Sequence, residues 1–83
     1  KILTRQGKDA AGGAYNYIIN GHMVAGFAMV AYPDQYGESG VMTFIVNQNG
    51  KVFQKDLGDQ SERVGESLDS FDPGAGWTVV EPQ

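Results

Sequence analysis

The dipeptide Asn49-Gly50 constrains the fold of this chain more than any other feature. It stands between two runs, 41–47 and 51–57, that are rich in β-branched and aromatic residues. Asn-Gly readily takes the two positive φ angles of a type I′ turn, which joins adjacent antiparallel strands. The sequence therefore predicts a β-hairpin with Asn49 and Gly50 as its two loop residues.

This turn fixes a register for the predicted hairpin. The pairs are Gln48 with Lys51, Val46 with Phe53, and Phe44 with Lys55. Because paired residues share a face, one face carries Met42, Phe44, Val46, Phe53, the stem of Lys55 and Leu57. The other face carries Val41, Thr43, Ile45, Asn47, Val52, Gln54 and Asp56. The first face holds the largest apolar side chains and is the predicted core, so Phe44→Ala is expected to cost about 3–5 kcal/mol.

A second hairpin precedes the first. The strand 15–19 ends at Asn20-Gly21, another type I′ signal, and the apolar run 23–32 follows. The predicted pairs are Ile19 with His22, Ile18 with Met23, and Tyr17 with Val24. Gly26 interrupts the long run and predicts a bulge or a close backbone approach. Beyond Gly26 the strand is apolar on both faces, which predicts a central position in the sheet.

The remaining segments are shorter. Residues 2–5 are a candidate first strand, 6–13 a loop, and 34–40 a polar loop that begins after Pro33. Residues 77–80 are a candidate edge strand.

A short helix is predicted after Gly58. Val64, Leu68 and Phe71 fall at the i, i+4 and i+7 spacing of one helical stripe. Asp59 is the expected N-cap, with Glu62 completing a capping box. Gly65 costs such a helix about 1 kcal/mol relative to alanine, so packing must hold it. We expect the stripe to cover Phe44 and Phe53.

The predicted fold class is α+β and strand-dominated: an antiparallel β-meander of four or five strands with one short helix packed on a face. Residues 1–83 are expected to form a single β-rich domain, the processed or C-terminal part of a longer chain.

Composition narrows the classes of function. The formal net charge of −4 argues against nucleic acid as a partner. The charge is unevenly divided, because residues 1–55 carry five basic and three acidic side chains, whereas residues 56–83 carry one basic and seven acidic. We interpret the acidic half as a solvated face, with a bipolar surface for head-to-tail association as the alternative. There is no cysteine and no apolar run of transmembrane length.

No residue cluster in the sequence indicates a chemistry, and we assign no catalytic, cofactor-binding or metal-binding residue. His22 is the only histidine and is interpreted as an exposed turn residue. The 10–14 stretch lacks a phosphate-binding glycine pattern. Glu66, Asp69 and Asp72 lack the spacing of an EF-hand and are interpreted as a solvated helix face rather than a calcium site. A sugar or peptide groove is the less favoured interpretation of a set of aromatic residues: Tyr15, Tyr17, Tyr32, Tyr36 and Trp77.

A set of motifs runs from Ile2-Leu3-Thr4 to Trp77, through 12–17, 26–33, 40–44 and 54–58. In these motifs the chain resembles the C-terminal segment of an uncharacterised family of secreted bacterial proteins. The resemblance implies export to the periplasm or cell exterior and brings no known activity or cofactor. A looser resemblance, carried by 31–33, 40–44 and 47–52, is to the globular head of type IV pilins and pseudopilins. The long N-terminal helix of the pilins is missing from this sequence.

We therefore expect a non-enzymatic exported structural or assembly domain. A more specific hypothesis is a pilin-like subunit of an extracellular filament or complex. Its partner is its own missing N-terminal segment, another chain, or further copies of itself. The alternative is a periplasmic small-ligand or glycan-binding module that uses the tyrosines and the 34–40 loop.

Overall fold

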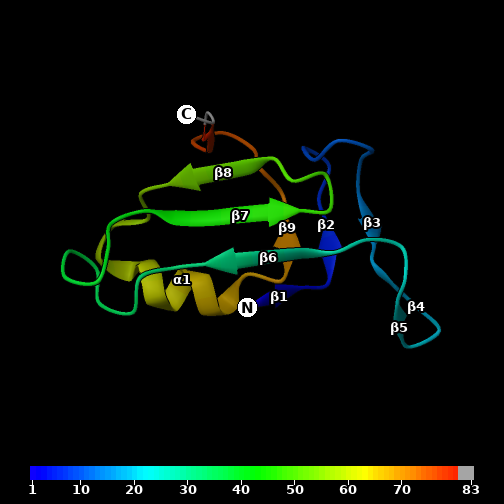
Figure 1. Ribbon diagram of the computed structural model, residues 1–83, viewed down its shortest axis with the longest axis horizontal. Helices are drawn as coiled ribbons and strands as arrows, with labels where there is room; N and C mark the ends of the chain where they lie inside the picture. The colour runs from blue at the N-terminus through cyan, green and yellow to red at the C-terminus, as the bar shows by residue number, and fades with distance from the viewer. Residues whose placement is uncertain (81–83) are drawn as a thin grey trace.

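A five-stranded antiparallel sheet forms one layer of the molecule. In the computed structural model, which describes residues 1–80, its strand order is β1 (Ile2–Leu3), β6 (Ala28–Ala31), β7 (Thr43–Asn47), β8 (Val52–Lys55) and β10 (Thr78–Val79). Strands β6, β7 and β8 lie side by side as a meander (Figure 1). The predicted α+β class, the meander, the central position of 28–31 and the edge position of the last strand are confirmed.

The second layer packs on one face of this sheet. It contains β2 (Arg5–Gln6), which pairs antiparallel with β3 (Tyr15–Asn16) and parallel with β9 (Ser70–Phe71). It also contains a 3₁₀ turn, η1 (Gly58–Gln60), that runs into the helix α1 (Ser61–Ser67). A separate hairpin, β4 (Ile18–Ile19) and β5 (His22–Met23), projects from one end of the molecule (Figure 1).

The core lies between the two layers. Its fully buried side chains come from both: Leu3, Ala10, Tyr17, Ala28, Val30, Ile45 and Phe71. Phe53 on β8 meets Phe71 on β9 edge to face, with ring centroids 5.9 Å apart. The buried Gln6 accepts a hydrogen bond from the Tyr17 hydroxyl at 3.0 Å and donates to the carbonyls of Ala11 and Gly13. The 7–13 loop is thus tied to the core by a polar side chain whose hydrogen bonds are satisfied.

The Asn49-Gly50 hairpin forms, but its predicted register is wrong by one residue. Val46 pairs with Val52 and Ile45 with Phe53, so the loop has three residues instead of two. Only Gly50 has a positive φ, and its N–H donates to the Asn47 carbonyl at 2.9 Å. The Asn47 side chain accepts a hydrogen bond from the Asn49 N–H at 3.0 Å. This Asx-type bond favours a type I turn closed by a glycine in the left-handed region over the two-residue type I′ turn.

The register error reverses the predicted core face of β7. Thr43, Ile45 and Asn47 are buried, whereas Phe44 is 38% exposed on the opposite face. A one-residue shift exchanges the two faces of a strand because side chains alternate with period two. Phe53 remains on the core side, so Phe44 and Phe53 do not share a face as predicted.

The second hairpin has the predicted turn. Asn20 and Gly21 both have positive φ, and Ile18 pairs with Met23 and Ile19 with His22. The expected third pair does not form, since the Tyr17 carbonyl accepts a hydrogen bond from the N–H of Ala25 at 3.1 Å instead. Gly26 makes the predicted close approach, because a Cβ there would come within 3 Å of the Tyr17 ring.

The helix is shorter than predicted. It ends at Ser67, Leu68 is extended, and Phe71 belongs to β9, so the proposed stripe of Val64, Leu68 and Phe71 spans two elements. Asp59 is not the N-cap, since it lies inside η1; the Asp56 carboxylate instead accepts from the Gly58 N–H at 2.9 Å. Gly65 is buried, and a Cβ at that position would meet the ring of Tyr32. Packing against the sheet therefore accounts for this glycine.

Candidate functional site

The outer face of the five-stranded sheet is largely apolar, and no other element within residues 1–80 covers it. Because of the register, Ile2 pairs with Met29, Met29 with Val46, and Val46 with Val52, which makes one continuous apolar row across four strands. A second row runs from Ala31 through Phe44 to the uncharged polar residues of β8 and β10. An antiparallel sheet usually has one apolar face that packs on the core and one polar face that contacts solvent. On this sheet the polar residues of the outer face are confined to its β8–β10 edge.

We call this surface the open face. It consists of Ile2, Phe27, Met29, Ala31, Met42, Phe44, Val46 and Val52. Its five largest exposed side chains retain between 37% and 47% of their accessible surface. At roughly 200 Å² for each large side chain, they expose on the order of 400 Å². That is within the range of about 300–600 Å² for the largest patch on a monomer, a patch that is often functional.

A hollow of about 470 Å³ lies at one end of the open face. Ala31, Met42 and Phe44 form part of its wall, and the remainder comes from the segments 32–33 and 39–41. Its lining is mainly apolar, with the Ser39 side chain on the loop side. Such a hollow can accept an apolar side chain from a partner, or a small molecule.

The 34–40 loop is held in place by hydrogen bonds. The Ser39 hydroxyl accepts from the Gln35 N–H at 2.9 Å, and the Gly37 N–H donates to the Gly40 carbonyl at 2.8 Å. The Tyr36 hydroxyl donates to the Asp56 carboxylate at 2.7 Å. This hydrogen bond, followed by partial burial and the charge of Asp56, raises the pKa of Tyr36. The loop is therefore fixed to the end of β8.

The four tyrosines and Trp77, considered above as a possible sugar or peptide groove, do not lie together. Tyr17 is fully buried, and burial followed by the neighbouring Tyr15 raises its pKa. Tyr32 packs on Gly65, Tyr36 binds Asp56, and Trp77 lies 5.9 Å from the Lys55 ammonium. Of the five aromatic residues, only Tyr32 lines the hollow of the open face.

The predicted solvent exposure of His22 is confirmed. It lies on β5 in the projecting hairpin, opposite Ile19. Among residues 1–80 no hydrogen bond or ion pair involves its side chain.

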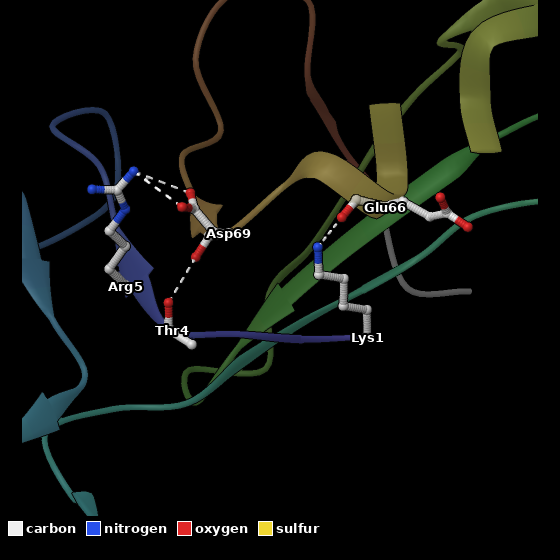
Figure 2. Close-up of polar contacts among 5 residues, drawn as sticks. All are labelled: Lys1, Thr4, Arg5, Glu66 and Asp69. Carbon is white, nitrogen blue, oxygen red and sulfur yellow. Dashed lines mark hydrogen bonds and ion pairs between the residues drawn. The ribbon is translucent and has the colours of Figure 1, made fainter. Parts of the chain in front are cut away.

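Glu66, Asp69 and Asp72, considered above as a possible calcium site, each have a different interaction partner. Asp69 forms an ion pair with Arg5 at 3.1 Å, and its carbonyl accepts from the Thr4 hydroxyl (Figure 2). Glu66 uses its carbonyl, not its carboxylate, to accept from the Lys1 ammonium (Figure 2). Asp72 accepts from the Asp9 N–H at 2.9 Å. Within the described part of the chain, no three acidic or histidine side chains gather as metal ligands do.

A second hollow, of about 350 Å³, lies on the core side of the 43–55 hairpin. Three distant segments line it: the loop at Asp9 and Ala11, the hairpin end, and the stretch from Phe71 to Pro73. Sequence reasoning missed this site because it depends on contacts between residues roughly 20 to 60 positions apart. The one local signal was Asn47, a polar residue inside an otherwise apolar strand.

These features define a small, strand-rich α+β domain with one uncovered apolar sheet face. The chain belongs to the DUF2950 family, described as a protein of unknown function, whose sequence profile matches residues 1–80. This agrees with the predicted membership of an uncharacterised family. No curated protein and no solved structure matches the chain. None of the helices within residues 1–80 has the length and apolar character needed to cross a membrane.

Proposed function

We propose that this protein is a non-enzymatic, exported structural or assembly domain that associates with a second copy of itself through the open face. The observation that carries the proposal is the continuous apolar row from Ile2 through Met29 and Val46 to Val52. The row has no charge that would select a charged partner. Two such faces are complementary to each other.

The expected complex is a β-sandwich. Two sheets pack face to face about 10 Å apart, with strand directions within about 30° of each other. An isologous contact of this kind closes after two copies because both use the same surface. The exposed area is about half of the roughly 800 Å² that each partner contributes to a standard interface. We therefore expect a weak, micromolar dimer whose rim adds polar contacts.

Oligomeric state tests this proposal directly. Sedimentation equilibrium from micromolar to millimolar concentration should show a reversible dimer. The double variant Met29→Lys, Phe44→Lys places charges on the open face and should be monomeric with an unchanged circular dichroism spectrum. Ile19→Lys is the matched control, since Ile19 is 50% exposed but lies on the β4–β5 hairpin.

The outcomes separate the possible occupants of the face. A parent protein that remains monomeric at millimolar concentration contradicts self-association and leaves another chain or another segment of the protein as the occupant. Dimers of the double variant would place the contact on a different surface.

Export is proposed from the resemblance to secreted bacterial proteins, and the pilin-like role from the looser resemblance to pilin heads. Fractionation of cells that express the natural gene tests the first, and electron microscopy of any assembly tests the second.

A periplasmic small-ligand or glycan-binding module is the alternative. The hollow beside the 34–40 loop favours it, because that loop is held by its own hydrogen bonds and supplies Ser39 to the lining. A thermal-shift screen against sugars and peptides distinguishes the two, since a ligand that binds only the folded state raises the melting temperature.

A further inference from the structure

The hollow on the core side of the hairpin contains an unpartnered polar group. Asn47 is only 6% exposed and lines this hollow. Its Oδ1 accepts the Asn49 N–H, and among the described residues its Nδ2 donates to no acceptor. The Nδ2 is open to solvent, because the one sealed side-chain atom without a partner among the described residues is the Thr43 hydroxyl, so a ligand in the hollow can accept a hydrogen bond from it. The hairpin turn fixes its position.

Two opposite charges line the same hollow. Asp9 lies in the 7–13 loop, and Lys51 directly follows Gly50 in the hairpin. They do not form an ion pair with each other, since the pair present among residues 1–80 is Arg5 with Asp69. Asp9 is held by its own backbone, whose N–H donates to the Asp72 carboxylate. One acidic and one basic residue therefore line the same small space.

The apolar wall of the hollow contains one partly buried aromatic ring, that of Phe53, and no fully exposed ring. Phe71 is 2% exposed and packs edge to face against Phe53, and Pro73 and Ala11 complete the wall. Sugars are commonly bound by stacking on an exposed ring, which this wall does not offer. An aliphatic side chain needs only apolar contact.

From this arrangement we infer that the hollow binds a small zwitterion, a free α-amino acid with an aliphatic side chain. Its ammonium faces Asp9, and its carboxylate faces Lys51 and the Nδ2 of Asn47. Its side chain lies against Phe53 and Pro73. The volume of about 350 Å³ is at the lower end of the roughly 300–1,000 Å³ of ligand pockets, as a ligand of this size requires.

The inference is tested with L-leucine as the probe. In a ¹⁵N-resolved NMR titration of the 83-residue chain, leucine should shift the side-chain amide signals of Asn47 and Asn49 and saturate. 4-Methylpentanoate lacks the ammonium and isopentylamine lacks the carboxylate, and each should bind at least about fivefold more weakly. These analogues test the charge pair without any change to the protein.

Three variants test the named residues. Asp9→Asn and Lys51→Gln should each weaken leucine binding at least about fivefold. Asn47→Asp retains the oxygen that accepts from Asn49 and removes the Nδ2 donor, and should weaken binding similarly. The matched controls Asp34→Asn and Lys55→Gln change the same charges outside this hollow and should bind as the parent does.

Several results would overturn the inference. They are the absence of a shift at tens of millimolar leucine, equal binding of either analogue, or stronger shifts of the same amides by a monosaccharide. Leucine binding should be independent of dimer formation, because Asn47 and Phe53 lie on the opposite side of the sheet from the open face. The Met29→Lys, Phe44→Lys variant should therefore bind leucine as the parent does.

Discussion

The buried hydroxyl of Thr43 has no partner among the described residues, and its side chain is fully buried. An unsatisfied buried polar group is costly, whereas an apolar group of the same shape is not. Thr43→Val should therefore stabilise the protein by about 1 kcal/mol in urea denaturation. Thr78→Val is the matched control, because Thr78 is exposed, and should change stability little. A destabilised Thr43→Val protein would indicate a bound water at the hydroxyl.

Gly65 separates helix propensity from packing. Propensity alone favours Gly65→Ala by about 1 kcal/mol. The structure predicts the opposite sign, because the new Cβ would meet the ring of Tyr32 and overpacking costs about 1–3 kcal/mol. We expect a net loss near 1 kcal/mol in thermal or urea melts. Glu66→Ala, at an exposed position of α1 outside its first turn, creates no such contact with Tyr32 and should not destabilise.

At the scale of elements, the hairpin register gives adjacent residues opposite energetic roles. Ile45 is 2% exposed and Phe44 is 38% exposed. Ile45→Ala should cost about 2–5 kcal/mol, whereas Phe44→Ala should cost about 1–2 kcal/mol when measured on the monomer, because only part of the ring is buried. Comparable losses in the two variants would contradict the register and restore the face predicted from the sequence.

The 34–40 loop is coupled to the end of β8 through a titratable contact. The hydrogen bond to Asp56 raises the pKa of Tyr36, so the fold favours the protonated phenol. The contact therefore contributes stability below the ordinary phenol pKa of about 10, and the contribution is lost as pH rises through the raised value. The stability difference between the parent and Tyr36→Phe should disappear at high pH. A difference that persists unchanged to high pH would contradict the contact between Tyr36 and Asp56.

The elements that depend on local signals are the ones that the sequence predicts well. Asn20-Gly21 specified the turn type and the strand pairing of its hairpin. Gly26 specified the close approach of the backbone to the Tyr17 ring. The 47–50 turn shows where local reasoning fails, because the Asn47 side chain competes for the Asn49 N–H and shifts the register. Phe71 fitted a helical period by coincidence, since its pairing partner Gln6 lies 65 positions away on β2. The open face and the second hollow follow from these non-local pairings.

For the whole molecule, the open face and the net charge of −4 act in opposite directions on association. Two acidic copies repel each other, and salt screens that repulsion without weakening apolar contact. Dimerisation should therefore tighten as sodium chloride rises from low to physiological concentration. The melting temperature should also rise with protein concentration, because association stabilises the folded state by mass action. A melting temperature independent of both would contradict the proposed dimer.

Thr4 is the point at which the chain passes from one layer to the other. The strand before it belongs to the five-stranded sheet and the strand after it to the three-stranded sheet. The Thr4 N–H and hydroxyl both donate to the carbonyl of Asp69, and the Thr4 carbonyl accepts from the Tyr17 N–H. The three-stranded sheet cannot be completed before Arg5 and Gln6 meet Ser70 and Phe71, and the same segment delivers β1 to the five-stranded sheet. Folding should therefore be slow for a chain of this length, because loop closure over most of the chain precedes the final contacts, and the two layers should be lost together in one kinetic step of unfolding.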